Sequence, residues 1–514
     1  MNRADFFKSF FKENQENLAG IEVNTNPLSA KQVAHLLRRT TFGISPAVTK
    51  TLIGKTAIQV VDLLLNNAVQ NPQPTLPVWK DTAYKNPERK PPADRQKAYD
   101  EIYSQLYKEN YDLVYWWMEK MQQDRLSIRE KMTLFWHGHF TTKFSIDGIM
   151  PAQSMLKQNQ FLRANHQGNF RTLMKGVTLD GAMLIFLNGQ DSTGKSPNEN
   201  YSRELLELYT MGIGHYTEND VQEGARILTG WRTNYYEDEY TNIGTHKPFF
   251  SIDRHDGGAK TYFGETIPPT SDNTDAAIIK NEIDPMMDII LRKKGDEVAN
   301  FICEKLYKYF VYSNPSPSAN ASNIIKEMAM TFKKNNFEIK PVLKQLLTSQ
   351  HFFDDTTIGI QLKTPAELVV GLTSHFNVKY DWASWVMSTM GQELLNPPNV
   401  AGWPGYRKWV NTRTFPFAVQ QAGYFVFNQT DDQLIKWIAQ FDTYEDPRKL
   451  TKQICETFLA KEVSENQLNK YVKTLMEGSP EYEWYEILKT PSNAGRKLKY
   501  LFVQLVKSPD FHLC

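Results

Sequence analysis

Cysteine is scarce in this chain: only three occur among its 514 residues, Cys303, Cys455 and Cys514. They lie far apart and form no CxxC pair, which argues against a disulfide scaffold and against a zinc site built on cysteine. Long apolar runs are also missing, because the longest one, residues 182–187, is far shorter than the roughly 20 residues of a membrane-spanning helix. These absences predict a soluble globular protein.

An excess of charge of one sign is missing too. The 59 Lys and Arg residues balance 58 Asp and Glu residues, so the formal net charge is +1. That balance argues against a nucleic-acid-binding protein and against an acidic disordered chain. The first twenty residues carry charges between their apolar pairs and lack a secretory signal, which predicts a cytoplasmic protein. Within them, Phe6, Phe7, Phe10 and Phe11 favour a short amphipathic helix, either docked on the body or lying on a membrane surface.

Helical periodicity dominates the rest of the chain, as Val33, Leu36 and Leu37 illustrate within residues 26–39. Further helices are expected at 56–65, 93–123, 126–137, 151–162, 170–175, 201–211 and 218–229. β-Branched and aromatic residues replace this pattern at 231–236 and 260–263, which predicts one small hairpin or ribbon within 231–264. Helices resume from residue 272, and strands and helices do not alternate. We therefore predict a mainly all-α fold with a small β insertion.

The length of 514 residues exceeds that of one ordinary domain, so either several compact units or one large helical body is expected. We predict an N-terminal extension, 1–25, followed by a single large helical unit, 26–514. Possible sub-lobes of that unit are 26–230, the β insertion at 231–271, and 272–514.

Two histidines flank a glycine in the segment FWHGHF. On a continuous helix His137 and His139 would point about 200° apart, so they converge only if the helix ends between them. Gly138 suits such an end, because glycine tolerates the left-handed conformation that closes many helices. The pair then predicts a site for a divalent ion such as zinc, iron or manganese. The alternative is that one histidine caps helix carbonyls and the other packs among aromatic rings.

The segment PNENYSRELLELY carries two carboxylates one helical turn apart, Glu204 and Glu207. Asn200 shares their face of the predicted helix, and Asn198 or Asn200 can cap its N-terminus. Such carboxylates can bind a metal or act as acid and base, while Arg203 orients an anionic group of a substrate. The alternative is a metal-free network in which Arg203 pairs with Glu207.

A formal match to the phosphate-binding pattern GxxxxGK[ST] follows the apolar run, with Gly189, Gly194, Lys195 and Ser196 as its fixed positions. Backbone N–H groups of such a loop hold phosphates, and its lysine reaches them. Pro197 stands where the helix should already be running, and the surrounding chain lacks the strand–helix pattern that the loop needs. A polar loop before the next helix explains the match as well.

Three further places contain residues suited to a site. A glycine-rich loop supplies His255 and Asp256. Trp403, in NPPNVAGWPG, can stack on a sugar ring, although packing within the loop explains it equally. Arg38 and Arg39 end the first clear helix and can hold an anion or cap the helix.

Taken together, these segments resemble the bacterial domain-of-unknown-function family 1800. The matching stretches are HLLRRTTFG, REKMTLFWHGHF, PNENYSRELLELYTMGIGHYTENDV, ARILTGW, the His255–Asp256 loop and NPPNVAGWPG, which together cover nearly the whole chain. The resemblance implies one large, mainly helical unit and no established reaction. It also implies a possible partner protein from a second, sulfatase-like family, 1501. Family members often look exported, whereas this N-terminus does not.

We therefore predict an enzyme-like polar site built from these segments, such as that of a metal-assisted hydrolase or a related enzyme. The catalytic candidates are Arg203, Glu204, Glu207, His255 and Asp256. The candidates for contacts to a substrate are Arg39, Asn198, Asn200, Trp231 and Trp403, and the metal candidates are His137 and His139. The alternatives are a helical scaffold that binds a partner protein or a glycan, and nucleotide binding at residues 189–196.

Overall fold

The computed structural model describes residues 20–70, 74–144, 150–270, 272, 274–314 and 316–514. The phenylalanines of the expected terminal helix lie outside these residues. The described chain is mainly helical, with only two small antiparallel sheets. The predicted all-α fold with a small β insertion is therefore confirmed, whereas the division into an extension and sub-lobes stays a prediction.

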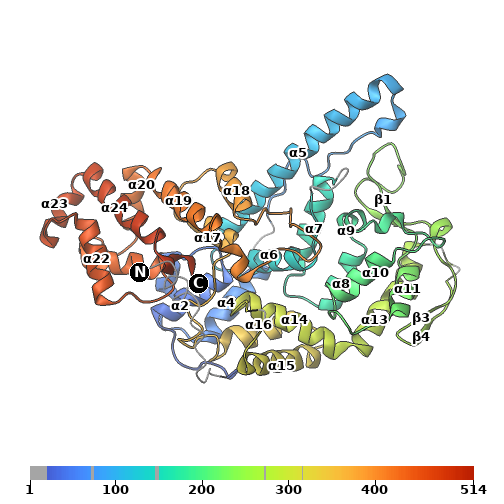
Figure 1. The fold of residues 1–514 in the computed structure, drawn as a ribbon, viewed down its shortest axis with the longest axis horizontal. Coiled ribbons are helices and arrows are strands. Elements are labelled where there is room, and N and C mark those ends of the chain that lie inside the picture. The colour runs from blue at the N-terminus through green and yellow to red at the C-terminus, as the bar shows by residue number, and fades with distance from the viewer. Residues whose placement is uncertain (1–19, 71–73, 145–149, 271, 273, 315) are drawn as a thin grey trace.

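The first half of the chain forms the centre and one side of the molecule (Figure 1). Its helices are α2 (Ala30–Thr40), α3 (Pro46–Leu52), α4 (Ala57–Gln70), α5 (Pro92–Gln123), α6 (Arg129–His139), α7 (Ala152–Ala164), α8 (Phe170–Thr178), α9 (Gly181–Phe186), α10 (Glu199–Glu207) and α11 (Glu218–Ile227). The helix expected at 93–123 is present as α5, and its N-terminal half projects beyond the body (Figure 1).

The β insertion contains two hairpins, not the single hairpin that the residue pattern predicted. Strand β1 (Trp231–Thr233) pairs with β2 (Pro248–Phe250), and β3 (Lys260–Tyr262) pairs with β4 (Glu265–Ile267). The second hairpin turns through Phe263 and Gly264, both with positive φ, as a two-residue turn that matches strand twist requires. The two predicted segments, 231–236 and 260–263, therefore do not pair with each other: each pairs with a three-residue strand that the residue pattern did not single out.

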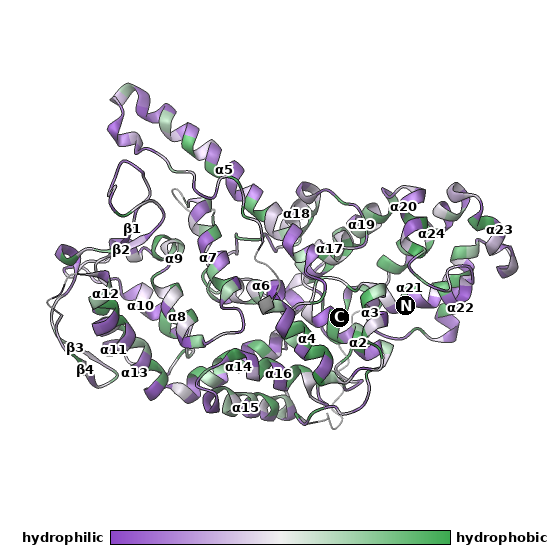
Figure 2. Cartoon of the chain, turned by 180° about the vertical axis from the view of Figure 1, so that it is seen from behind, coloured by the Kyte–Doolittle hydropathy of each residue, from purple (hydrophilic) through white to green (hydrophobic). Residues whose placement is uncertain are grey.

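The second half of the chain completes the other side and the base (Figure 1). Along the base lie α12 (Asp275–Ile278), the π-helical turn η4 (Ile279–Ile283), α13 (Asp284–Lys293), α14 (Gly295–Phe310), α15 (Ala319–Lys334) and α16 (Ile339–Thr348). The far side holds α17 (Pro365–Thr373), α18 (Tyr380–Thr389), α19 (Thr414–Phe427), α20 (Asp431–Ile438), α21 (Pro447–Phe458), α22 (Glu465–Met476), α23 (Trp484–Leu488) and α24 (Pro491–Val506). Most of these helices show one hydrophobic and one hydrophilic face (Figure 2).

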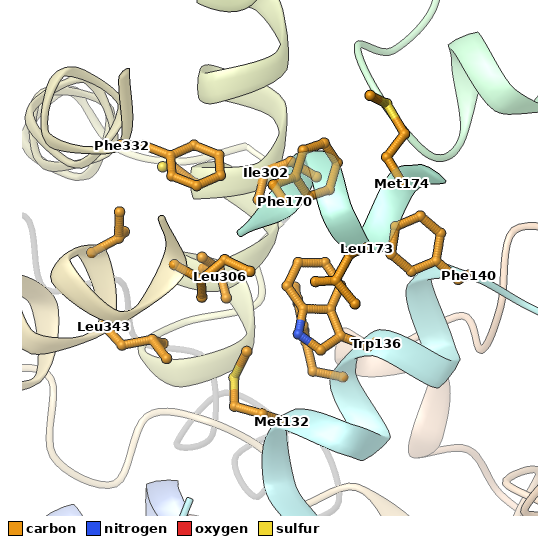
Figure 3. Packing of buried hydrophobic residues seen from close by; sticks show 14 of the residues in the cluster. Met132, Trp136, Phe140, Phe170, Leu173, Met174, Ile302, Leu306, Phe332 and Leu343 are labelled. Atoms are coloured by element: carbon orange, nitrogen blue, oxygen red, sulfur yellow. The ribbon is translucent and has the colours of Figure 1, made fainter. Parts of the chain in front are cut away.

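Two large clusters of buried side chains form the core. One gathers residues from α2–α4, α6 and α8–α16, and the other gathers residues from α5, α7 and α17–α24. Helix α6 lies between them, with Trp136 in the first cluster and Leu134 in the second. Trp136 is fully buried among side chains of α8 and α14, and its indole N–H donates to the His166 carbonyl at 2.8 Å (Figure 3). Helix α6 therefore joins the two halves of the core.

Helix α6 does not end where the sequence predicted. It continues through Gly138 to His139, and the Phe140 N–H donates to the Trp136 carbonyl at 2.7 Å. Gly138 is absent from the residues with positive φ, so it does not close the helix.

Within the described residues, no helix is both long and apolar enough to cross a membrane.

Candidate functional site

The two histidines of the HxH segment lie in different surroundings, as a continuous helix requires. The His137 ring lies 5.5 Å from the Trp117 ring and 5.6 Å from the Trp403 ring, and burial lowers its pKa to about 3. His139 lies beside Phe140 and Tyr209. In the described part of the chain, no group of three or more His, Cys, Asp and Glu side chains is arranged to hold a metal ion. The structure thus gives the predicted metal pair no shared site.

His139 and Lys305 instead bind the carbonyls that end helix α10. The His139 Nε2 lies 2.9 Å from the Tyr209 carbonyl, and the Lys305 ammonium donates to the Leu208 carbonyl at 3.1 Å. The two side chains also contact each other, with 3.0 Å between Lys305 Nζ and His139 Nδ1. Burial, and then the charge of Lys308, lower the pKa of Lys305 to about 7. These contacts tie α6, α10 and α14 together, because they satisfy carbonyls that a helix end leaves without partners.

The carboxylates of α10 lie on a half-buried face. Arg203 pairs with Glu218 at 2.6 Å and not with Glu207, which instead accepts a hydrogen bond from the Tyr216 hydroxyl. Burial and the neighbouring charge of Glu207 raise the pKa of Glu204 above its ordinary value. Among the described residues, neither carboxylate forms a hydrogen bond or an ion pair with the histidines of α6, so these contacts do not join the two predicted halves of the site.

The two asparagines at the start of α10 have different environments. Asn198 is the N-cap: its side chain accepts from the Tyr201 N–H at 3.0 Å and donates to the Leu187 carbonyl at 2.8 Å. Asn200 is exposed. Asn198 therefore fixes the start of α10, as its position predicted.

The match to a phosphate-binding loop has a different structure from such a loop. Helix α9 precedes it in place of a strand, and α10 begins only at Glu199. The Gly194 N–H donates to the Arg254 carbonyl at 2.7 Å, and the Ser196 N–H donates to the Thr193 carbonyl at 3.0 Å. Gly189 opens a short 3₁₀ turn, and Lys195 is exposed. Two backbone donors that would have to face a phosphate are thus used within the protein.

His255 belongs to a closed buried network. Lys260 donates to Glu282 at 2.7 Å and to His255 Nε2 at 3.2 Å, and the His255 Nδ1 lies 2.9 Å from the Thr229 carbonyl. The side chains of His255, Lys260 and Glu282 are 0% exposed, which leaves a substrate no access to them. Glu282 comes from the π-helical turn η4, a distortion that often marks functional sites. Here that turn directs a carboxylate at a buried lysine.

Asp256 and the two tryptophans also have protein partners. Asp256 forms a two-pronged pair with Arg226, at 2.7 and 3.1 Å, which holds the pKa of its carboxyl below the ordinary value. Trp231 is buried against Phe250. Trp403 is half-buried and packs on His137, so its ring is not an open stacking surface.

The remaining candidate, Arg39, leads to a second constellation of charged groups at the boundary between the two core clusters. Arg38 and Arg39 each bind the carbonyl end of a different helix. Arg38 donates through Nη2 to the Glu456 and Leu459 carbonyls of α21, both at 2.5 Å, and Arg39 donates through Nε to the Phe310 carbonyl of α14 at 3.0 Å. Arg39 is 0% exposed and Arg38 is 8% exposed.

A buried ion pair stands next to these arginines. Lys131 donates to Glu367 at 2.5 Å, and the Arg39 Nη1 lies 3.6 Å from the same oxygen. A capping box at the start of α17 positions the carboxylate, because Glu367 also accepts from the Thr364 N–H at 2.8 Å. Burial raises the pKa of Glu367, but Lys131 and Arg39 outweigh it and bring that pKa to about 2. Glu367 is therefore ionised at neutral pH.

Two further groups close the constellation. The Lys363 ammonium donates to the Phe511 carbonyl at 2.5 Å, and burial together with the charge of Arg38 lowers its pKa to about 7. The Cys514 thiol lies 2.5 Å from the Arg39 Nη1, and burial raises its pKa above the ordinary value.

These groups surround a small cavity. It has a volume of about 50 Å³, and its lining includes Arg38, Lys363, Glu367, His375 and Cys514. The Glu367 side chain is only 7% exposed, whereas Lys363 and His375 are half-buried residues, so the cavity is bordered by partly exposed residues on that side. We call it the charged cavity. It brings together α2, α17, the end of α21 and the C-terminal segment.

Sequence reasoning found only part of this cavity. The sequence singled out Arg38 and Arg39, as residues that hold an anion or cap the helix, but it did not single out Lys131, Lys363 or Glu367. A signal was present for Glu367, since TPAE is a capping-box pattern that fixes the position of its carboxylate. No local pattern relates Lys131 to Glu367, because they are separated by 236 residues.

The comparisons with known proteins agree with the resemblance noted in the sequence. A family model described as "Protein of unknown function (DUF1800)" matches residues 35–513. No curated protein and no solved structure matches the chain. Because the family model covers nearly the whole sequence, from the HLLRR helix to the segment that lines the charged cavity, the chain belongs to this family of unknown function.

Proposed function

We propose that this protein binds an anionic small molecule, with its anionic group in the charged cavity. The observation that carries the proposal is the imbalance of charge: Arg38, Arg39, Lys131 and Lys363 lie in or beside the cavity with one carboxylate, Glu367. Buried charges are costly unless they are paired. An anion in the cavity would supply the missing charge.

The donors needed for such a ligand point to Arg38 and Lys363. Of the three guanidinium nitrogens of Arg38, Nη2 alone has hydrogen-bond partners among the described residues. The other two nitrogens are left for a ligand. Lys363 uses one N–H on the Phe511 carbonyl, and an ammonium has three. A guanidinium and an ammonium at one cavity are a donor set suited to carboxylate or phosphate oxygens.

The metal-assisted hydrolase predicted from the HxH and NENxxRExxE segments stays a prediction. We favour the charged cavity because His139, His255 and Asp256 are engaged with protein groups, whereas the cavity offers space beside free donors. The sulfatase-like partner implied by the family resemblance likewise stays a prediction.

The proposal is tested by thermal unfolding of the purified protein in phosphate, sulfate and acetate, against chloride at matched ionic strength. A ligand that binds only the folded state raises the midpoint as its concentration increases. We expect such a rise with at least one of these anions, and we expect Arg38→Gln to abolish it.

The comparison variant is Arg203→Gln, because Arg203 is the anion-orienting residue of the predicted hydrolase. If the response survives in Arg38→Gln and is lost in Arg203→Gln, the ligand binds at α10 and the proposal is wrong. It is also wrong if the wild type responds to none of the anions.

A further inference from the structure

Building on the proposed function, we infer that the ligand of the charged cavity is hydrogen phosphate. The inference rests on three properties of the cavity: its charge, its size and the carboxylate in its wall. Each of them separates phosphate from another common anion.

Charge favours a dianion over a monoanion. Arg38 and Lys363 line the cavity, Arg39 and Lys131 lie beside it, and Glu367 is the carboxylate in its wall. The carbonyl ends of α14 and α21, bound by Arg39 and Arg38, contribute further negative charge. A net positive charge remains when Lys363 is protonated, and a bound anion favours that protonated form. A phosphate of charge near −2 favours it more strongly than a carboxylate ligand of charge −1.

Size favours a compact head group. A water molecule needs about 10–15 Å³ of such a cavity, so about 50 Å³ holds a group of only a few atoms. A tetrahedral oxyanion is of that size. Its oxygens point in four directions, which suits a site whose donors come from two segments, Arg38 on α2 and Lys363 before α17.

The carboxylate of Glu367 favours phosphate over sulfate. Because Lys131 and Arg39 keep Glu367 ionised, this side chain can only accept hydrogen bonds. Its oxygens bind Lys131 and the Thr364 N–H, and an ionised carboxylate has further acceptor positions. Hydrogen phosphate carries a P–OH that can donate to Glu367. Sulfate has no proton at neutral pH and would place lone pairs against the carboxylate.

The experiment is isothermal titration calorimetry of the full chain at pH 7, with inorganic phosphate, methyl phosphate, sulfate and acetate as separate probes. We expect phosphate to bind at least about 10-fold more tightly than sulfate. The P–OH of phosphate can donate to Glu367, whereas sulfate has no proton to donate and places an acceptor oxygen against the carboxylate. Acetate should bind more weakly than phosphate. Methyl phosphate, which at pH 7 is mostly a dianion without a P–OH, should bind more weakly than inorganic phosphate, and equal binding would overturn the role given to that proton.

Variants locate the site. Lys363→Gln should weaken phosphate binding about 10-fold or more, and Lys363→Arg should restore most of it, because the positive charge returns. Arg496→Gln serves as the control, since Arg496 is an exposed residue of α24 that pairs with Glu477. Circular dichroism of each variant establishes that it is folded. If Arg38→Gln fails to fold, the Lys363 variants still test the site, because Lys363 is a half-buried residue.

The outcomes separate this inference from the proposed function. Equal binding of sulfate and phosphate, or tighter binding of acetate, would overturn the inference while an anion site in the cavity stands. Phosphate binding that is unchanged in Lys363→Gln would also overturn it. Absence of binding for every probe would remove both.

Discussion

The buried ion pair between Glu130 and Arg163 provides a test of how this core is held together. Glu130 accepts two hydrogen bonds from Arg163, at 2.7 and 2.8 Å, and a third from the Trp117 indole at 3.0 Å. The side chains of the pair are each only 1% exposed. Glu130→Gln removes the negative charge but keeps the size of the side chain, so a buried guanidinium loses its counter-charge. We expect a loss of about 3–5 kcal/mol in the free energy of unfolding.

The matched control is the ion pair between Glu88 and Arg95, with a similar distance of 2.8 Å but side chains 55% and 39% exposed. Glu88→Gln should cost at most about 1 kcal/mol, because water already solvates both charges. Urea unfolding, followed by tryptophan fluorescence, measures both variants. At unchanged slope the difference in midpoints gives the difference in free energy.

The pH dependence supplies the sign of the effect. Burial alone raises the pKa of Glu130, but the charge and hydrogen bonds of Arg163, with smaller contributions from Arg129 and Trp117, bring it below the ordinary value of 4.5. A depressed folded pKa stabilises the protein fully above the unfolded pKa, and this contribution is lost as the pH falls through the folded pKa. The advantage of the wild type over Glu130→Gln should therefore shrink below about pH 4.5.

Two results would refute this reasoning. One is a cost for Glu130→Gln no larger than that for Glu88→Gln. The other is an advantage of the wild type that grows towards acid pH. The double variant Glu130→Gln/Arg163→Met should regain part of the lost stability, because it also removes the unpaired cation.

Two further predictions concern packing. Trp136→Ala should lower the free energy of unfolding by about 3–5 kcal/mol, measured by thermal or urea unfolding, because it opens a cavity where α6 meets α8 and α14. Trp385→Ala should cost much less, because that residue is 52% exposed. Equal losses would contradict the placement of Trp136. Gly402→Ala should lower the melting temperature more than Gly405→Ala: both glycines have positive φ, but only at Gly402 would an added Cβ lie 2.3 Å from the carbonyl oxygen of Gly138, so equal shifts would show that this contact is absent.

Local patterns in the sequence predicted most of the helices, and the reason is visible in α5 and α10. Apolar spacing and an N-cap act within a few residues, so Asn198 could be assigned its role without knowledge of the fold. The end of α6 was predicted wrongly because Gly138 permits a helix end but does not require one. The position of the helix end is decided by contacts of His139 with Tyr209 and Lys305, which keep His139 within the helix.

The charged cavity could not be derived in the same way. Its arginines were noticed because they stand together, but their charge gains meaning only from Lys363 and Glu367, more than 300 positions further along the chain. Pairing over such separations depends on how α2, α17 and the C-terminal segment come together. Helix α10 shows the same dependence on the fold: residues of one segment suggested a site, but the partners of Arg203 and Glu207, which are Glu218 and Tyr216, come from the helix and the turn that follow.

The two adjacent arginines of α2 also have a consequence for biosynthesis. Arg38 contacts a carbonyl 421 positions later, and Arg39 contacts a thiol 475 positions later. At about 5–20 residues per second, the ribosome needs on the order of half a minute to a minute and a half to supply these partners. Throughout that time the end of α2 is a cationic, incompletely buried surface on a nascent chain. Synthesis of these distant partners, rather than local helix formation, therefore sets when the two halves of this core can close on each other.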